Sequence, residues 1–140
     1  MHILLIGCGR SGRRLAELLS ESGYDLVLMD KDKNKLDELS DLNAISIHGY
    51  PLDTSVLETA GIEQAAAVIA IDDNENLNIM ICQIAKTIYH VEQCIARTYT
   101  PENEDFVKNL GLKSICSTEL TVGLALSILG IDSINSDTQI

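Results

Sequence analysis

Short apolar runs alternate with amphipathic stretches along nearly the whole chain, and this alternation limits the available folds more than any other feature. Runs of up to five apolar residues, without a polar residue at every second position, are typical of strands covered on both faces. They lie at residues 3–6, 26–29, 44–47, 67–71, 94–96 and 114–116. Strands separated by helices predict an α/β fold, a Rossmann-like doubly wound sheet of six parallel strands in the order 3-2-1-4-5-6.

Helical periodicity fills the intervals between these runs. Apolar residues at spacings of three and four indicate helices over residues 10–22, around 36–39, over 56–60, over 77–88 and from Pro101 to Gly111. A last helix over 120–129 is apolar nearly all round, so part of its surface should need a partner. We therefore expect a single domain over residues 1–129, a polar tail at 130–140, and a homodimer at least.

Charge and hydropathy argue against two classes of partner. The chain has 10 Lys and Arg against 21 Asp and Glu, a net charge of −11. Phosphate-backbone binding relies on clustered basic residues, so no nucleic-acid partner is expected. The apolar runs fall short of the roughly 20 residues that span a bilayer, so no direct membrane insertion is expected. Residues 1–40, with six basic and seven acidic residues, are nearly neutral and would repel an anionic ligand least.

A glycine-rich motif follows the first apolar run and opens the first predicted helix. It reads Gly7-Cys8-Gly9-Arg10-Ser11-Gly12, which is the G-x-G-x-x-G pattern of dinucleotide-binding turns. In that mechanism Gly7 permits the tight turn, Gly9 lets a pyrophosphate approach the backbone, and Gly12 allows close helix–strand packing. Amides at the helix N-terminus would face the phosphates. The alternative is a purely structural strand–helix turn.

An acidic residue, Asp30, ends the second apolar run 18 residues after Gly12. A carboxylate at this place accepts hydrogen bonds from ribose hydroxyls and repels a 2′-phosphate. The motif and Asp30 therefore predict binding of ATP, ADP, AMP or NAD(H) in preference to NADP, although Lys31 and Lys33 nearby weaken that preference. A solvated acid at a strand end is the alternative for Asp30.

Further candidates flank the loop. Arg10 and Arg13 start the first helix, where a cation opposes the helix dipole unless an anion is held nearby. Solvated arginines are the alternative. Ile71 and Asp72 end the fourth run, which neighbours the first strand in this topology. The segment from Asp72 to Asn76 should first of all cap the next helix, with contact to the ligand, or to a cation on it, as a second role.

The four cysteines are Cys8, Cys82, Cys94 and Cys116, without a C-x-x-C pair. This spacing favours buried thiols in a reducing compartment over a zinc site or a disulfide framework. Cys8 lies at a helix N-terminus, where the pKa of a thiol can fall, and a reactive role is the minor alternative there. No nucleophile–base pair stands out among these residues.

Several other stretches complete a specific pattern: Leu28–Asp32, Asp53–Ile62, Ala67–Ala70 followed by Asn78 and Lys86, Ala96-Arg97, Asn109–Gly111 and Cys116–Glu119. With the glycine loop, they resemble the N-terminal nucleotide-binding domain of the RCK/KTN (TrkA-N) family. These are the cytosolic regulatory domains of Trk- and Ktr-type potassium transporters and of many potassium channels. The resemblance covers residues 1–129.

The resemblance implies a regulatory module that pairs as a homodimer, commonly within an octameric ring beneath a membrane pore. It implies a cytoplasmic location, peripheral to the inner face of the membrane through a potassium-transport subunit. Binding of ATP, ADP or NAD(H) would then change the shape of the assembly and so the gate.

The resemblance also implies roles for single residues. By matching position, phosphates would be held by Gly7, Gly9, Gly12 and Arg10, and the ribose by Asp30. Arg97, at the end of the fifth predicted strand, would lie near the ligand. Glu119 matches a position that in some members helps to bind a divalent cation (Mg or Ca) between paired subunits, and a glutamate that merely stabilises its helix is the alternative.

One departure and two alternatives remain. Gly49-Tyr50-Pro51 stands where the family usually has Gly-Asp or Gly-Asn near the adenine, which leaves the base preference open. The first alternative is the Rossmann domain of an NAD-dependent oxidoreductase, which predicts hydride transfer. The second is a nucleotide-binding interaction protein unrelated to potassium.

Overall fold

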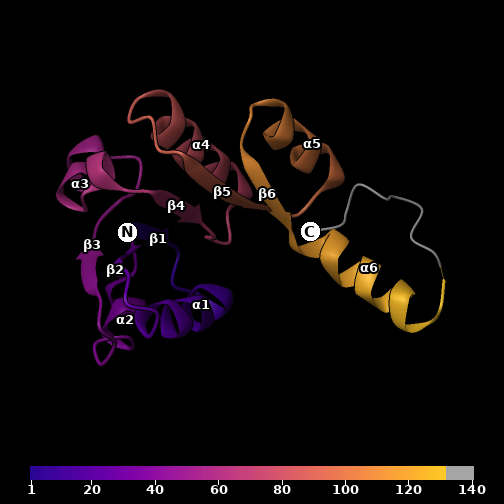
Figure 1. The fold of residues 1–140 in the computed structure, drawn as a ribbon, viewed down its shortest axis with the longest axis horizontal. Coiled ribbons are helices and arrows are strands. Elements are labelled where there is room, and N and C mark those ends of the chain that lie inside the picture. The colour runs from indigo at the N-terminus through magenta and orange to yellow at the C-terminus, as the bar shows by residue number, and fades with distance from the viewer. Residues whose placement is uncertain (132–140) are drawn as a thin grey trace.

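The computed structural model describes residues 1–131, which form a six-stranded sheet with helices on both faces (Figure 1). The order is β3-β2-β1-β4-β5-β6, and every neighbouring pair is parallel. This confirms the doubly wound α/β sheet predicted from the sequence. The strands are β1 (His2–Ile6), β2 (Asp25–Asp30), β3 (Ile45–His48), β4 (Ala67–Ala70), β5 (Gln93–Thr98) and β6 (Lys113–Cys116).

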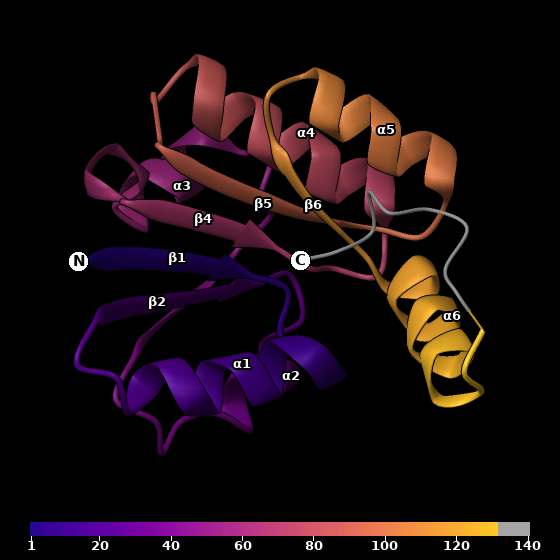
Figure 2. The ribbon, with the colours of Figure 1, turned by 45° about the vertical axis from the view of Figure 1, so that its right-hand side comes forward.

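The helices divide between the two faces of the sheet (Figure 2). One face is covered by α1 (Arg10–Ser20) and α2 (Lys33–Asp37). The other is covered by α3 (Thr54–Thr59), the 3₁₀ turn η1 (Ile62–Gln64), α4 (Glu75–Thr87) and α5 (Pro101–Asn109). The last helix, α6 (Ser117–Ile128), follows β6 without a connecting loop.

Alternate side chains of the central strands supply two separate cores. In β1, Leu4 and Ile6 join the core beneath α3, α4 and α5, whereas Ile3 and Leu5 join the core beneath α1 and α2. All four side chains are 4% exposed or less. A strand buried on both faces has no solvent-facing position, which explains why its sequence is continuously apolar.

Side-chain caps fix where most of the helices begin. Asp32, Asp53 and Asn74 precede α2, α3 and α4, and each accepts a hydrogen bond from a backbone amide in the first turn. Thr100 does the same for α5, with a proline in its first turn. Helix α1 differs, because its N-cap is Gly9, which has no side chain to offer.

Helix α6 projects from the end of β6, away from the sheet (Figures 1 and 2). None of its residues is buried, and Leu124 and Ile128 are 64% and 85% exposed. Only part of the helix surface was expected to need a partner, whereas the structure leaves no residue of the helix buried. An all-round apolar helix has no single stripe that would direct it onto the sheet. It also starts three residues before the predicted range, because its polar first turn carries no apolar periodicity.

Two further observations complete the fold. Within residues 1–131, the longest helices are too short or too polar to cross a lipid bilayer. The predicted polar tail at 130–140 falls outside the described residues from position 132 onward.

Candidate functional site

A shallow cleft lies where β1, β2 and β4 end side by side. The residues that line it are Gly7, Gly9, Asp30, Lys35, Ile71, Asp72 and Asp73. Five of these were predicted from the sequence, and the parallel sheet brings them together because the carboxyl ends of its strands share one edge. Asp73 was predicted only as part of the segment from Asp72 to Asn76, and Lys35 was not predicted.

Two of the three motif glycines are required by the turn itself. Gly7 has a φ of +104°, and its amide donates to the carbonyl oxygen of Met29 at 3.0 Å. A Cβ atom on Gly7 would come within 2.5 Å of the Asp72 amide nitrogen. A Cβ atom on Gly12 would overlap the carbonyl oxygen of Gly7. These glycines therefore let β1, α1 and the β4–α4 loop approach closely, whether or not a ligand is bound.

Gly9 has a different environment. No heavy atom lies within 4 Å of the position that a Cβ atom would take there. Gly9 is the N-cap of α1, which has no capping side chain and no acidic residue in its first turn. Exposed Arg10 and Ser11 follow it. Open space in front of an uncapped helix N-terminus is the arrangement that binds phosphate groups in proteins.

Asp30 ties the end of β2 to the glycine loop. Its carboxylate is 3% exposed, and its Oδ2 accepts a hydrogen bond from the Cys8 amide at 2.8 Å. Its Oδ1 accepts from the Asp32 amide, also at 2.8 Å. Each carboxylate oxygen can accept a second hydrogen bond, so the clamp on the loop is compatible with the predicted contact to ribose hydroxyls.

Cys8 contributes its backbone rather than its thiol. Burial, reinforced by the neighbouring Asp30 carboxylate, raises the pKa of the Cys8 thiol to about 12. This direction argues against the reactive role that was the minor alternative for Cys8, because burial disfavours the thiolate. All four cysteines are buried and free of disulfides, as the sequence predicted.

The opposite wall, the β4–α4 loop, is held by a buried amide. Asn78 is 0% exposed; its Oδ1 accepts from the Asp72 amide at 2.9 Å, and its Nδ2 donates to the Asp72 carbonyl at 2.8 Å. The same Nδ2 donates to the Arg97 carbonyl at 3.1 Å. The predicted cap of the following helix is confirmed, since Asn74 accepts from the Leu77 amide.

Arg97 supports this wall from behind. Its guanidinium donates to the Ile71 carbonyl at 2.7 Å and pairs with Asp73 at 3.3 Å. It lies over the ring of Tyr99, and Arg97 is not among the residues that line the cleft. The structure thus places Arg97 where it fixes the loop, one layer away from the open face of the cleft.

The remaining predicted residues lie around the cleft or apart from it. Lys31 pairs with Asp72 across the end of β1 at 3.9 Å. Arg13 pairs with Glu38 of the α2 C-terminus at 2.7 Å, which favours the structural alternative for this arginine. Glu119 lies in the first turn of α6 and does not line the cleft. In the described part of the chain, no three His, Cys, Asp or Glu side chains gather into a possible metal site.

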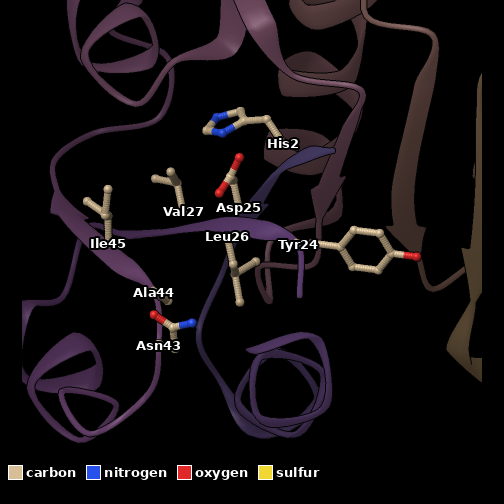
Figure 3. A pocket seen from close by; sticks show the side chains of 8 residues that line it. All are labelled: His2, Tyr24, Asp25, Leu26, Val27, Asn43, Ala44 and Ile45. Atoms are coloured by element: carbon tan, nitrogen blue, oxygen red, sulfur yellow. The ribbon is translucent and has the colours of Figure 1, made fainter. Parts of the chain in front are cut away.

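A larger hollow lies at the opposite edge of the sheet, where β2 and β3 begin (Figure 3). His2 and Asp25 point to one side of the strand, whereas Leu26 and Asn43 point to the other. The hollow therefore wraps around the sheet edge instead of entering the molecule. It lies at the amino ends of the strands, and doubly wound sheets bind their ligands at the carboxyl ends.

Comparison with known proteins identifies the family. The model of the TrkA-N domain matches residues 3–118. The chain belongs to the TrkA-N domain family. The Trk system potassium uptake protein TrkA of Streptomyces coelicolor is 32% identical to this TrkA-N domain over 122 residues, which cover 86% of this chain and 55% of that protein. The chain thus spans about half the length of this curated relative.

Solved structures share the fold of this TrkA-N domain. The TrkA-N domain of inner membrane protein ybaL from Escherichia coli matches with a TM-score of 0.84 at 23% identity, over 91% of this chain and 96% of that one. The Kef CTD of Shewanella denitrificans, in its AMP-bound form, matches with a TM-score of 0.72 at 27% identity, over 99% and 85%. The GsuK channel bound to NAD matches with a TM-score of 0.75 at 20% identity, over 91% and 23%.

The different environments of the glycines predict different costs of substitution. Gly12→Ala should lower the free energy of unfolding by about 1–3 kcal/mol or more, because the new methyl group overlaps the Gly7 carbonyl. Gly9→Ala should cost less than about 1 kcal/mol, because its methyl group enters open space at an N-cap. Urea denaturation of the ligand-free proteins measures both, and equal costs would contradict the described packing.

The buried amide predicts a second contrast. Asn78→Ala should destabilise the ligand-free protein by about 1–3 kcal/mol, because it leaves the partly buried amide and carbonyl of Asp72 without their partners. Asn76→Ala, an exposed position on the same helix, is the matched control and should change stability by less than about 0.5 kcal/mol. Thermal unfolding of the two variants would show no difference if the loop were held by other contacts.

Proposed function

We propose that this TrkA-N domain is a cytosolic regulatory domain of a potassium-transport system and binds an adenine nucleotide (ATP, ADP or AMP) or NAD(H) in the cleft at Gly7–Gly12. The observation that carries the proposal is the open space in front of Gly9 at the uncapped N-terminus of α1. Gly7 and Gly12 are required by the fold, but nothing in the described structure requires a glycine at position 9. A ligand that lies against the backbone at this position would leave no room for a side chain, which accounts for the glycine.

Each part of such a ligand has a matching partner in the cleft. Phosphates would accept hydrogen bonds from the first amides of α1, with Arg10 as a nearby cation. The ribose hydroxyls would donate to Asp30, whose charge disfavours a 2′-phosphate and hence NADP. The AMP of the Kef CTD structure and the NAD of the GsuK structure support this class of ligand.

The proposed signal is a change of assembly. We infer a homodimer at least, formed through the uncovered apolar surface of α6, with an octameric ring as the larger assembly that the resemblance implies. The partner would be a membrane potassium-transport subunit, which would hold the domain at the inner face of the membrane. A divalent cation at Glu119 would belong to the same subunit contact.

Regulation then follows from linkage. A nucleotide shifts the assembly between two shapes only as far as its affinities for the two shapes differ. Membership of the TrkA-N family favours this binding role over the oxidoreductase alternative. The potassium-independent alternative would be favoured if no membrane transporter co-purified with the protein.

Calorimetric titration tests the binding site. The domain should bind one or more of ATP, ADP, AMP, NAD and NADH and bind NADP at least about 10-fold more weakly, because Asp30 repels the 2′-phosphate. Gly9→Ala should abolish binding although its fold is retained. A 2′,3′-dideoxy analogue of the best ligand should lose about 10-fold or more, since charged hydrogen bonds to Asp30 are absent.

The analogue isolates the ribose contact better than a change of Asp30 would, because Asp30 also holds the amides of Cys8 and Asp32. Titrations with and without Mg²⁺ or Ca²⁺ report whether a cation takes part. If no ligand of the series binds the wild-type domain, the glycine loop is only a structural turn and the proposal fails.

Light scattering tests the assembly. The wild-type domain should have at least twice the 15.3 kDa mass of one chain. A double change of Leu124→Asp and Ile128→Asp should give a folded monomer, because two charges would be buried at the contact. Leu18→Asp, on α1 and 48% exposed, is the matched control and should leave the mass unchanged. A wild-type monomer would exclude the α6 contact.

A further inference from the structure

The cleft contains three carboxylates, and each of them already has partners. Asp30 accepts from the amides of Cys8 and Asp32. Asp72 pairs with Lys31, and Asp73 pairs with Arg97. Each carboxylate of the cleft is therefore stabilised by groups of the protein itself, two of them by cations and Asp30 by amide hydrogen bonds.

Lys35, in contrast, has no partner of opposite charge in the part of the chain that the structure describes. It extends from α2, lines the cleft beside Gly9 and Asp30, and is half-buried, whereas Lys31 and Lys33 are exposed. No carboxylate of residues 1–131 lies within 4 Å of its ammonium group. A partly buried cation without an anion is costly, so this position is the kind that an anionic ligand completes.

The position of Lys35 is set by its neighbours. Helix α2 packs beside α1 on the same face of the sheet, and Arg13 of α1 pairs with Glu38 at the end of α2 (Figure 2). Leu36, next to Lys35, is 4% exposed and anchors the helix in the core. The charge of Lys35 also reaches the loop: the pKa of the Cys8 thiol is raised by burial and by Asp30, and Lys35 opposes that rise.

We propose that Lys35 is a phosphate-binding residue of the cleft, which contacts the 5′-phosphate chain of the nucleotide from the α2 side while the amides of α1 contact it from the other. This inference rests on the proposed function and names a contact that the glycine motif does not predict. It makes the cleft selective for ligands phosphorylated at the 5′ position, because an uncharged nucleoside would leave Lys35 without a partner.

The test compares Lys35→Gln with Lys33→Gln, an exposed lysine two residues earlier on the same helix. Both variants and the wild type are titrated with ADP, 5′-AMP, 2′-AMP and adenosine at low and high salt. Lys35→Gln should weaken ADP binding about 10-fold or more, as expected for loss of a charged hydrogen bond, and should flatten the salt dependence. Lys33→Gln should change binding less than about 3-fold. Lys35→Arg should retain most of the affinity.

A structural role would give a different result. Lys35→Gln should leave the thermal unfolding temperature of the ligand-free domain unchanged and leave adenosine binding, where measurable, at the wild-type level. Wild-type ADP affinity in Lys35→Gln, equal losses for ADP and adenosine, or a loss confined to 2′-AMP would each overturn the inference. If the wild-type domain binds no nucleotide at all, the proposed function fails with it, and that outcome is visible before any variant is made.

Discussion

The close approach of β1, α1 and the β4–α4 loop is the constraint on which the site depends. Only a residue without a side chain fits at Gly7, where a Cβ atom would reach the Asp72 amide, and at Gly12, where it would reach the Gly7 carbonyl. This packing brings the N-terminus of α1 to the edge where three strands end. The free amides of that helix then face a cleft instead of a side-chain cap, so the geometry that closes the core also forms the proposed anion site.

Two hydrogen-bonded supports hold the cleft from its two sides. Asp30 fixes the glycine loop from β2, while Asn78 of α4 and Arg97 of β5 fix the β4–α4 loop. Thr98, next to Arg97, is in register with Cys116, and α6 begins one residue later. No flexible connection therefore separates the wall of the cleft from the root of α6. Under the proposed function, a ligand that moved this wall would act on β5, and through the β5–β6 pairing on the direction of α6.

Some features of the fold and the cleft could be predicted from the sequence and others could not, for physical reasons. The strand order, the glycine turn and Asp30 were predicted because they depend on local pattern: continuous apolar runs, a motif placed between strand and helix, and an acid at a strand end. Asn78 and Lys35 depend on tertiary contacts. Asn78 lies on the buried face of α4, where periodicity indicates an apolar residue, and Lys35 looks like one of three solvated lysines until α2 is placed beside α1. No sequence pattern indicated the direction of α6, because apolar residues lie on all sides of this helix and define no single buried face.

The charge of the chain would oppose an anionic ligand if it acted as a single net value, since it amounts to −11. Charges separated by more than about 8–10 Å are largely screened at physiological salt, so the local arrangement decides. In the cleft the carboxylates of Asp72 and Asp73 are paired with cations, and that of Asp30 accepts one amide hydrogen bond on each oxygen. Lys35 and Arg10 are the cations there that have no carboxylate partner among residues 1–131. Counted with Lys31 and Arg97, the cations around the cleft therefore balance its three carboxylates, although the protein as a whole is acidic. A single nucleotide is small enough to meet mainly this balanced surrounding, whereas a polyanion such as a nucleic acid would also meet the net negative charge of the rest of the protein.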